Sequence, residues 1–374
     1  MVSCSIGYYL VVCSGYLHNV GGFGCWVLGV FVCFFGFRYF LLNTGLYYCV
    51  KLIDSGDISD LSENLGIDDS DLRREARWEL VEMGEEAVKP LISKLGSGDS
   101  AVVKDAAWVL GRVEDPRAVM PLVDLLGDES SSVAKRAARA LVRIGEEALP
   151  AMLEQLGSDC VERRRLAAWF LPDFGDSGVG EALFEALGDD DVLVRRNAAR
   201  AVGLLDVPDA VGALGVALKD DDWRVRQWAA YSLGLISRRS GATRGLIRAL
   251  GDESRHVEFA AMVALGDNGS RSAVDRLLTR LGSDDKLIVC GAVKALGNIG
   301  ARKAVEPLLD LYHVGDKFVR GEVLLALARI GGSSMVYSVL EEALGGELAE
   351  TAEVALGLLG TGRALGVLER HGLA

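Results

Sequence analysis

The sequence predicts an all-α fold, an α-solenoid (superhelix) of about ten two-helix repeats, preceded by an apolar N-terminal segment. Two observations support this fold class. A leucine–glycine pair recurs about every 31 residues, and an apolar pattern of helical period keeps step with it. The composition agrees, since 45 glycines, only 7 prolines and 7% aromatic residues suit helices joined by short glycine turns.

The recurring pair is an anchor from which each repeat can be counted. From Leu65 to Leu281 successive anchors are separated by 30, 31, 30, 31, 31, 32 and 31 residues. Leu218-Lys219 and Leu311-Tyr312 take the place of the pair in two repeats. The remaining anchors are Leu65-Gly66, Leu95-Gly96, Leu126-Gly127, Leu156-Gly157, Leu187-Gly188, Leu250-Gly251, Leu281-Gly282 and Leu344-Gly345. A period this regular favours stacked hairpins over a globular bundle.

A second helix of about 15 residues is predicted after each anchor. The seventh, eleventh and fifteenth residues past the anchor share one helical face and are mostly apolar, although Arg163 breaks this rule in one repeat. The eleventh is alanine after each of the eight anchors from Leu65 to Leu281, which lets two helices approach closely. These alanines are Ala76, Ala106, Ala137, Ala167, Ala198, Ala229, Ala261 and Ala292. We expect this face to be buried.

The first helix of each repeat is shorter and ends at the anchor leucine. The glycine that follows suits a left-handed C-cap. Aspartates come next and are expected to cap the second helix: Asp99, Asp128, Asp189, Asp220, Asp252 and Asp284. We interpret the runs 189–191 and 220–222 as caps rather than as a cation site. Pro172 should kink or stop the second helix in which it lies.

Several segments resemble HEAT repeats, in particular the short HEAT-like repeat of the bilin-lyase (phycobiliprotein lyase) type. Val194–Gly203 (VRRNAARAVG) and Val225–Gly234 (VRQWAAYSLG) carry the Val-Arg-x-x-Ala-Ala-x-Ala-Leu-Gly pattern, and Ala295–Gly300 (ALGNIG) matches its end. The resemblance covers nearly all of residues 57–366. It implies the solenoid fold, and it implies no catalytic residue, cofactor or metal ligand for this chain.

The same resemblance leaves two enzymatic alternatives. One branch of similar proteins attaches bilins to phycobiliproteins, which would make the chain a lyase-like subunit acting on a chromophore or modifying a protein partner. Another branch, deoxyhypusine hydroxylase, holds two irons through His-Glu pairs. None of the four histidines here (His18, His256, His313 and His371) precedes a glutamate, which argues against a metal-dependent hydroxylase.

The N-terminal segment differs in composition from the repeats. We divide the chain into an apolar segment, residues 1–49, and the repeat solenoid, residues 50–374. Residues 1–37 contain no Asp, Glu, Lys or Arg, and Phe23–Leu42 is long enough to span a bilayer as a helix. Two interpretations stay open: a membrane anchor through residues 20–42, which would leave the repeats in the cytoplasm, or a mis-assigned start.

Charge argues for a protein partner. The net charge of −13 argues against nucleic acid, yet the ninth and thirteenth residues after each anchor form a basic and aromatic stripe through the first five repeats and into the sixth. Its members are Arg74, Trp78, Lys104, Trp108, Lys135, Arg139, Arg165, Trp169, Arg196, Arg200 and Tyr231. We expect this stripe on the concave face, docking an acidic peptide or protein. The alternative is a solvated basic face whose tryptophans fill ridges between helices.

The expected function is therefore a non-catalytic interaction scaffold with cytoplasmic repeats. No glycine-rich phosphate loop, nucleophile elbow or zinc-ligand spacing occurs. The seven cysteines include no CxxC pair, so the spacing indicates neither a zinc site nor a redox motif. Cation–π pairs within one helix, Arg74 with Trp78 and Arg165 with Trp169, are expected to be within reach.

Overall fold

The computed structural model describes residues 10–11, 30–34, 37–41, 58–236 and 241–373. The chain divides into two compact units, Met1–Leu122 and Val123–Ala374, here called the N-terminal and C-terminal units. The boundary falls within one short helix, α5 (Val119–Asp124).

The membrane helix expected at Phe23–Leu42 is not found in the described part of that window. β2 (Val30–Phe34) and β3 (Phe37–Leu41) pair antiparallel there, with Val32 opposite Tyr39, and β1 (Leu10–Val11) pairs with β2. Valine, phenylalanine and tyrosine favour extended backbone, which accounts for strands in this segment. No helix among the described residues is both long and apolar enough to cross a bilayer.

The repeat region is helical, as predicted, and its helices α1 to α20 form ten consecutive pairs. In the N-terminal unit the helices are α1 (Ile58–Glu63), α2 (Ser70–Glu82), α3 (Glu85–Lys94) and α4 (Ser100–Val113). The next five helices after α5 are α6 (Ser131–Ile144), α7 (Leu149–Glu154), α8 (Val161–Phe170), α9 (Gly180–Ala186) and α10 (Val192–Leu204). Then come α11 (Ala210–Ala217), α12 (Trp223–Leu235), α13 (Ala242–Ala249), α14 (Arg255–Asp267), α15 (Val274–Arg280) and α16 (Lys286–Ile299). The last are α17 (Val305–Val314), α18 (Lys317–Ile330), α19 (Ser334–Leu344), α20 (Ala349–Leu359) and α21 (Gly362–Arg370).

Short 3₁₀ helices extend the ends of several of these helices. They are η1 (Pro116–Ala118), η2 (Leu125–Gly127), η3 (Gly145–Ala148), η4 (Gln155–Gly157), η5 (Leu171–Phe174), η6 (Ser177–Val179), η7 (Arg271–Ala273) and η8 (Arg302–Ala304). Pro172 ends a helix as predicted, because α8 stops at Phe170 and the chain continues as η5.

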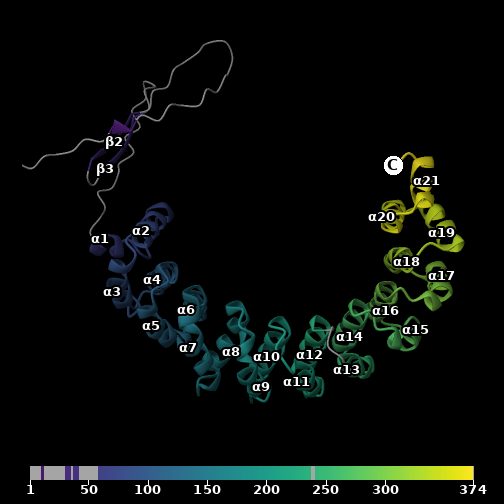
Figure 1. The fold of residues 1–374 in the computed structure, drawn as a ribbon, viewed down its shortest axis with the longest axis horizontal. Helices are drawn as coiled ribbons and strands as arrows, with labels where there is room; N and C mark the ends of the chain where they lie inside the picture. The colour runs from purple at the N-terminus through teal and green to yellow at the C-terminus, as the bar shows by residue number, and fades with distance from the viewer. Residues whose placement is uncertain (1–9, 12–29, 35–36, 42–57, 237–240, 374) are drawn as a thin grey trace, which may run out of the picture. The chain divides into compact units, whose positions relative to one another are not determined.

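Within the C-terminal unit the even-numbered helices form an inner row and the odd-numbered helices an outer row (Figure 1). Each inner helix packs against the next, from α8 with α10 to α18 with α20. The inner row lies on the concave side of this unit, as expected for the second helices of a solenoid (Figure 1).

The predicted buried face is confirmed. All eight alanines at the eleventh position are at most 2% exposed, and the fifteenth position is buried from Leu80 to Leu296. Leu72, at the seventh position of α2, is the exception at 45% exposed, and the helix beside it, α1, has only six residues. Arg163 does not enter the core, because its guanidinium donates to the Asp124 carbonyl oxygen at 3.1 Å.

Small residues set the spacing of the inner row. A Cβ added to Gly297 on α16 would lie 2.7 Å from the Cα of Ala326 on α18, and one added to Gly266 on α14 would lie 2.8 Å from the Cα of Ala295 on α16. Gly203 likewise faces Ser232, whose hydroxyl donates to the Ala199 carbonyl oxygen at 2.7 Å. Backbone therefore approaches backbone between successive repeats.

The left-handed caps expected at the anchor glycines are wrong for all but Gly66, which has a φ of +78°. The first helices end instead in tight turns with i to i+3 hydrogen bonds, as when Gly188 donates to the Glu185 carbonyl oxygen at 2.9 Å. Left-handed glycines end second helices, for example Gly300 after α16 (φ +68°). At those ends a positive φ provides the sharp reversal from one repeat to the next.

Filling the contact at Gly297 should destabilise the stack. We expect Gly297→Ala to lower the free energy of unfolding by about 1–3 kcal/mol, since the new methyl meets backbone that cannot move aside alone. Gly212→Ala in α11 is the matched control, because a Cβ there meets nothing within 4 Å. It should stabilise the protein by about 0.5–1 kcal/mol through helix propensity. Urea unfolding followed by circular dichroism measures both; equal midpoints would contradict the close-packing argument.

Candidate functional site

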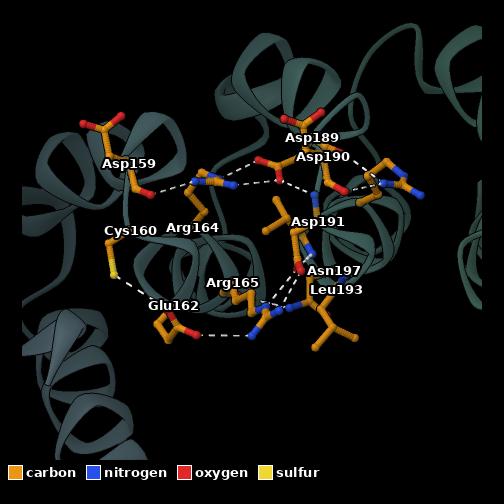
Figure 2. Close-up of polar contacts among 12 residues, drawn as sticks. Asp159, Cys160, Glu162, Arg164, Arg165, Asp189, Asp190, Asp191, Leu193 and Asn197 are labelled. Atoms are coloured by element: carbon orange, nitrogen blue, oxygen red, sulfur yellow. Dashed lines mark hydrogen bonds and ion pairs between the residues drawn. The ribbon is translucent and has the colours of Figure 1, made fainter. Parts of the chain in front are cut away.

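Arginines and aspartates link successive repeats in the C-terminal unit. Arg195 of α10 donates to Asp220 from Nε at 2.7 Å and from Nη2 at 3.0 Å, while its Nη1 donates to the Asp189 carbonyl oxygen at 2.8 Å. The same bidentate arrangement joins Arg164 to Asp189 and Arg226 to Asp252 (Figure 2 shows the Arg164 pair). These arginines stand eight residues after their anchors and serve the fold.

Of the aspartates expected to cap the second helices, Asp99 does so. In the other repeats a different residue is the N-cap. Asp99 caps α4 by accepting from Ala101 N at 2.7 Å. The caps of α10, α12 and α16 are Asp191, Asp222 and Asp285, one or two residues beyond the aspartates expected. Asp128, Asp189, Asp220 and Asp252 each accept from the backbone N–H two residues on, and the last three also hold the arginines. A count of residues from the anchor cannot tell which of two or three neighbouring residues in the turn becomes the N-cap.

A groove of about 600 Å³ lies on the inner row over α6, α8 and α10. It brings together five members of the predicted stripe: Lys135, Arg139, Arg165, Trp169 and Arg196. The other lining residues are Asp128, Glu129, Ser131, Ala134, Glu162, Leu166, Phe170, Leu193 and Asn197. We call this the basic groove, and the ninth and thirteenth positions of the repeats do meet there.

Arg165 lies in the groove but is already paired. Its Nε and Nη2 donate to Asp191 at 2.9 and 2.6 Å, and its Nη1 donates to Glu162 at 3.3 Å (Figure 2). Asp191 also accepts from Leu193 N and Val194 N as the cap of α10. The hydrogen bonds from Arg165 are the main cause that lowers the pKa of Asp191 to about 2. Arg165 thus ties α8 to the start of α10.

Arg196 and Arg200 are half-buried and form no ion pair with a described residue. Arg196 donates to the amide oxygen of Asn197 at 3.0 Å, and Arg200 lies over the Trp169 ring at 4.1 Å while donating to the Trp169 carbonyl oxygen. Burial lowers the pKa of both guanidinium groups from the ordinary value, and the charge of Arg224 adds to the effect on Arg196. Both groups stay charged at neutral pH, with less hydration than an exposed arginine has.

Lys135 and Arg139 on α6 are exposed and also lack an ion-pair partner among the residues that the structure describes. Trp169 is 40% exposed, so it does not fill a ridge between helices. Tyr231 on α12 is half-buried, stacks edge-on to Trp228 at 5.9 Å and does not line the groove.

In the N-terminal unit the stripe residues form a separate cluster. The rings of Trp78 (α2) and Trp108 (α4) meet edge to face at 5.4 Å, and Arg112 lies 5.1 Å from both. Arg74 is paired instead with Asp71 at 2.8 Å. Lys104 is half-buried on α4.

The cation–π pairs expected within one helix are therefore replaced by pairs between repeats. Arg112 covers Trp78, and Arg200 covers Trp169. Arg74 and Arg165, the cations expected at these rings, are instead bound to carboxylates.

Asn197 is a groove residue that the sequence did not single out. It is 5% exposed, donates from Nδ2 to the Arg165 carbonyl oxygen at 3.0 Å and accepts from Arg196. It holds the guanidinium of Arg196 beside α8. The sequence could have pointed to Asn197, because it places an asparagine at the tenth position after an anchor. The later repeats have Trp228, Ala260 and Gly291 at that position.

Comparison with known proteins bears on the fold. A family model described as HEAT repeats matches residues 58–132, 88–172, 180–244, 214–290 and 290–360, which is more than half of the chain. The chain belongs to the HEAT-repeat family. The expected resemblance is confirmed. No curated protein sequence matches the chain.

Solved structures show the same fold at low identity. Kap121p bound to Nup53p has 13% identity and a TM-score of 0.62, covering 82% of this chain and 42% of that one. Importin beta has 16% identity and a TM-score of 0.58, covering 81% of this chain and 51% of that one. The chain thus spans about half the length of these importins. The CpcE–CpcF complex of phycocyanin lyase from Nostoc sp. PCC7120 also matches, with 20% identity, 67% of this chain, 94% of that one and a TM-score of 0.35.

The part of the chain that the structure describes contains no cluster of three or more His, Cys, Asp or Glu side chains arranged to hold a metal ion.

The Arg165–Asp191 pair should make stability depend on pH. Because folding lowers the pKa of Asp191 from 3.8 to about 2, the pair stabilises the fold fully above about pH 4, and this contribution is lost as pH falls through 2. Asp191→Asn should cost about 2 kcal/mol at pH 7, and its deficit against the wild type should shrink from pH 4 to pH 2. Asp190→Asn, at an exposed neighbour, is the control. Urea unfolding between pH 2 and 7 measures this, and a deficit that does not change with pH would contradict the assignment.

Proposed function

We propose that the chain is a non-catalytic scaffold whose basic groove binds an acidic segment of a partner protein. The observation that supports this most is the state of Arg196, which lines the groove, and of Arg200, which lies over the ring of the groove residue Trp169. Both are partly desolvated, and neither has an ion pair among the described residues, while the neighbouring Arg164, Arg165 and Arg195 are each bound to an aspartate. An incoming carboxylate would supply the missing counter-charge.

The surroundings of these two arginines suit a chain more than a small ion. Lys135 and Arg139 add exposed charge on α6, two inner helices away, and Trp169 on α8 adds an exposed ring between α6 and α10. Helices pack about 9 Å apart, and an extended chain advances about 3.3 Å per residue, so one contact per repeat falls on about every third residue. Such a ligand would meet cations on α6 and α10 and the exposed Trp169 ring on α8 between them.

The acidic character of the whole protein gives the groove selectivity. A net charge of −13 repels long polyanions, whereas a short acidic segment meets mainly the local cations. Arg165, although part of the predicted stripe, serves the fold in this proposal because its donors are taken by Asp191 and Glu162.

The fold is compatible with this role, since Kap121p, a HEAT-type solenoid of similar fold, was solved bound to Nup53p. Both described cysteines, Cys160 and Cys290, are free thiols. A cytoplasmic location would be consistent with them.

A designed acidic peptide tests the proposal. The probe is a fluorescein-labelled 12-residue peptide of about four glutamates, one at every third position, with glycine and serine between them. We expect anisotropy to report binding that weakens with added salt. Arg196→Gln combined with Arg200→Gln should weaken it by about tenfold or more, because each lost charge-assisted contact costs about 1.5–3 kcal/mol.

The matched control is Arg276→Gln combined with Arg244→Gln, which removes the same charge from exposed arginines on outer helices. It should leave binding nearly unchanged. Thermal unfolding should show that the groove variant is no less stable than the wild type, since it removes desolvated charge. Equal loss in both variants, or tighter binding of a single-stranded oligonucleotide than of the peptide, would overturn the proposal.

A further inference from the structure

The inner surface changes character beyond the basic groove. At the positions that hold Arg196 and Arg200 in α10, the following helices present mainly aromatic and apolar side chains. In α12, α14 and α16 the ninth positions are Gln227, Phe259 and Cys290, and the thirteenth positions are Tyr231, Val263 and Lys294. Leu287 adds a further apolar group at the sixth position of α16. We call the part formed by Phe259, Val263, Leu287 and Cys290 on α14 and α16 the apolar stretch.

The side chains of the apolar stretch are half-buried, and the Phe259 ring packs against Gly291 of the next inner helix. A Cβ added to Gly291 would lie 2.9 Å from the Phe259 ring and 2.9 Å from the sulfur of Met262, so the missing side chain on α16 leaves the space that the ring occupies. Burial raises the pKa of the Cys290 thiol, which therefore stays neutral at pH 7 and behaves as an apolar group.

The apolar stretch and the basic groove share one row of helices. The contacts run without a break from α8 through α10, α12 and α14 to α16. The row lies on the concave side of the C-terminal unit, where a flat membrane surface cannot follow it but a polypeptide segment can (Figure 1).

We infer that the partner segment is bipartite, with acidic residues in the basic groove followed, about six to eight residues away, by bulky apolar residues on the apolar stretch. Inner helices are about 9 Å apart, so α14 lies two spacings and α16 three spacings from α10. An extended chain, which advances about 3.3 Å per residue, crosses this distance in about six to eight residues. This inference rests on the proposed function, because the acidic end sets the register of the apolar end.

The shared segment matters for affinity. Exposed arginine contacts give a salt-sensitive, weak interaction, whereas burying aromatic and aliphatic side chains adds a contribution that salt does not screen. Joining the two in one chain makes the second contact intramolecular and so raises affinity beyond either alone.

Three synthetic peptides test this on the full chain. The first is the acidic probe described above. The second extends it with leucine and phenylalanine at the sixth and eighth residues past the last glutamate, and the third has the same composition with both apolar residues next to that glutamate. We expect the second to bind about tenfold more tightly than the first, from burying one to two apolar side chains. The third should gain less than about threefold.

A footprint on the unaltered protein gives an independent measurement. Iodoacetamide modification of Cys290, followed by mass spectrometry, should slow with the second peptide bound and not with the first. Phe259→Ala should reduce the advantage of the second peptide, while Val314→Ala should not, because Val314 is 82% exposed on the outer helix α17. Circular dichroism checks that the Phe259 variant is folded.

The outcomes separate the two proposals. If the acidic peptide binds and neither extension adds affinity, the bipartite partner is wrong and the proposed function stands. If the second and third peptides bind equally, the spacing is wrong. If no peptide binds, the proposed function fails, and the bipartite inference fails with it.

Discussion

The close approach of one inner helix to the next is the constraint on which the C-terminal unit depends. Glycine at the sixteenth position after an anchor faces a small residue of the following repeat, as Gly266 faces Ala295 and Gly297 faces Ala326. At these contacts a methyl group would collide with backbone. Each repeat therefore buries its alanine face only when the neighbour is present, and stability is shared along the row. The Arg195–Asp220 type of pair then fixes the ends of the same helices, and its bidentate geometry sets their angle as well as their distance.

This arrangement separates arginines that are adjacent in sequence into different roles. Arg164 and Arg195, eight residues after their anchors, point to the next repeat and bind aspartates that also close the turn before a helix. Arg196, one residue further, turns by about 100° on the helix and reaches the concave surface instead. The periodicity of the helix decides the direction in which an arginine points, and the partners that it meets there decide whether it is free to bind a ligand.

The net negative charge of the chain, −13, is compatible with a groove that carries unpaired cations. Many aspartates of the C-terminal unit lie at helix N-termini, where backbone N–H groups and arginines of the preceding repeat bind them; Asp189, Asp191 and Asp220 are examples. These three carboxylates are occupied by backbone N–H groups and by Arg164, Arg165 and Arg195. Cations at the ninth and thirteenth positions, such as Arg196 and Arg200, are thereby left without a counter-charge among the described residues.

The sequence by itself determined the architecture, because a hydrophobic face that is repeated at a fixed period is buried when each hairpin stacks on the next. Ten hairpins, the buried alanines and the stop at Pro172 follow from local pattern and sterics. It also indicated which positions face inward, since residues four apart share a helix face. It did not resolve the turns, where Asp191 and not Asp189 caps α10, because capping depends on dihedral angles rather than on spacing.

Only the tertiary structure decided which arginines are available. Arg165 and Arg196 occupy the same position in successive repeats, yet Arg165 meets Asp191 of the next repeat, while Arg196 finds the amide of Asn197. That difference depends on partners about 26 residues away along the chain, brought within hydrogen-bonding distance by stacking. A repeat pattern read along one chain contains the spacing of charges but not their pairing, because pairing is a property of side chains that meet across repeats.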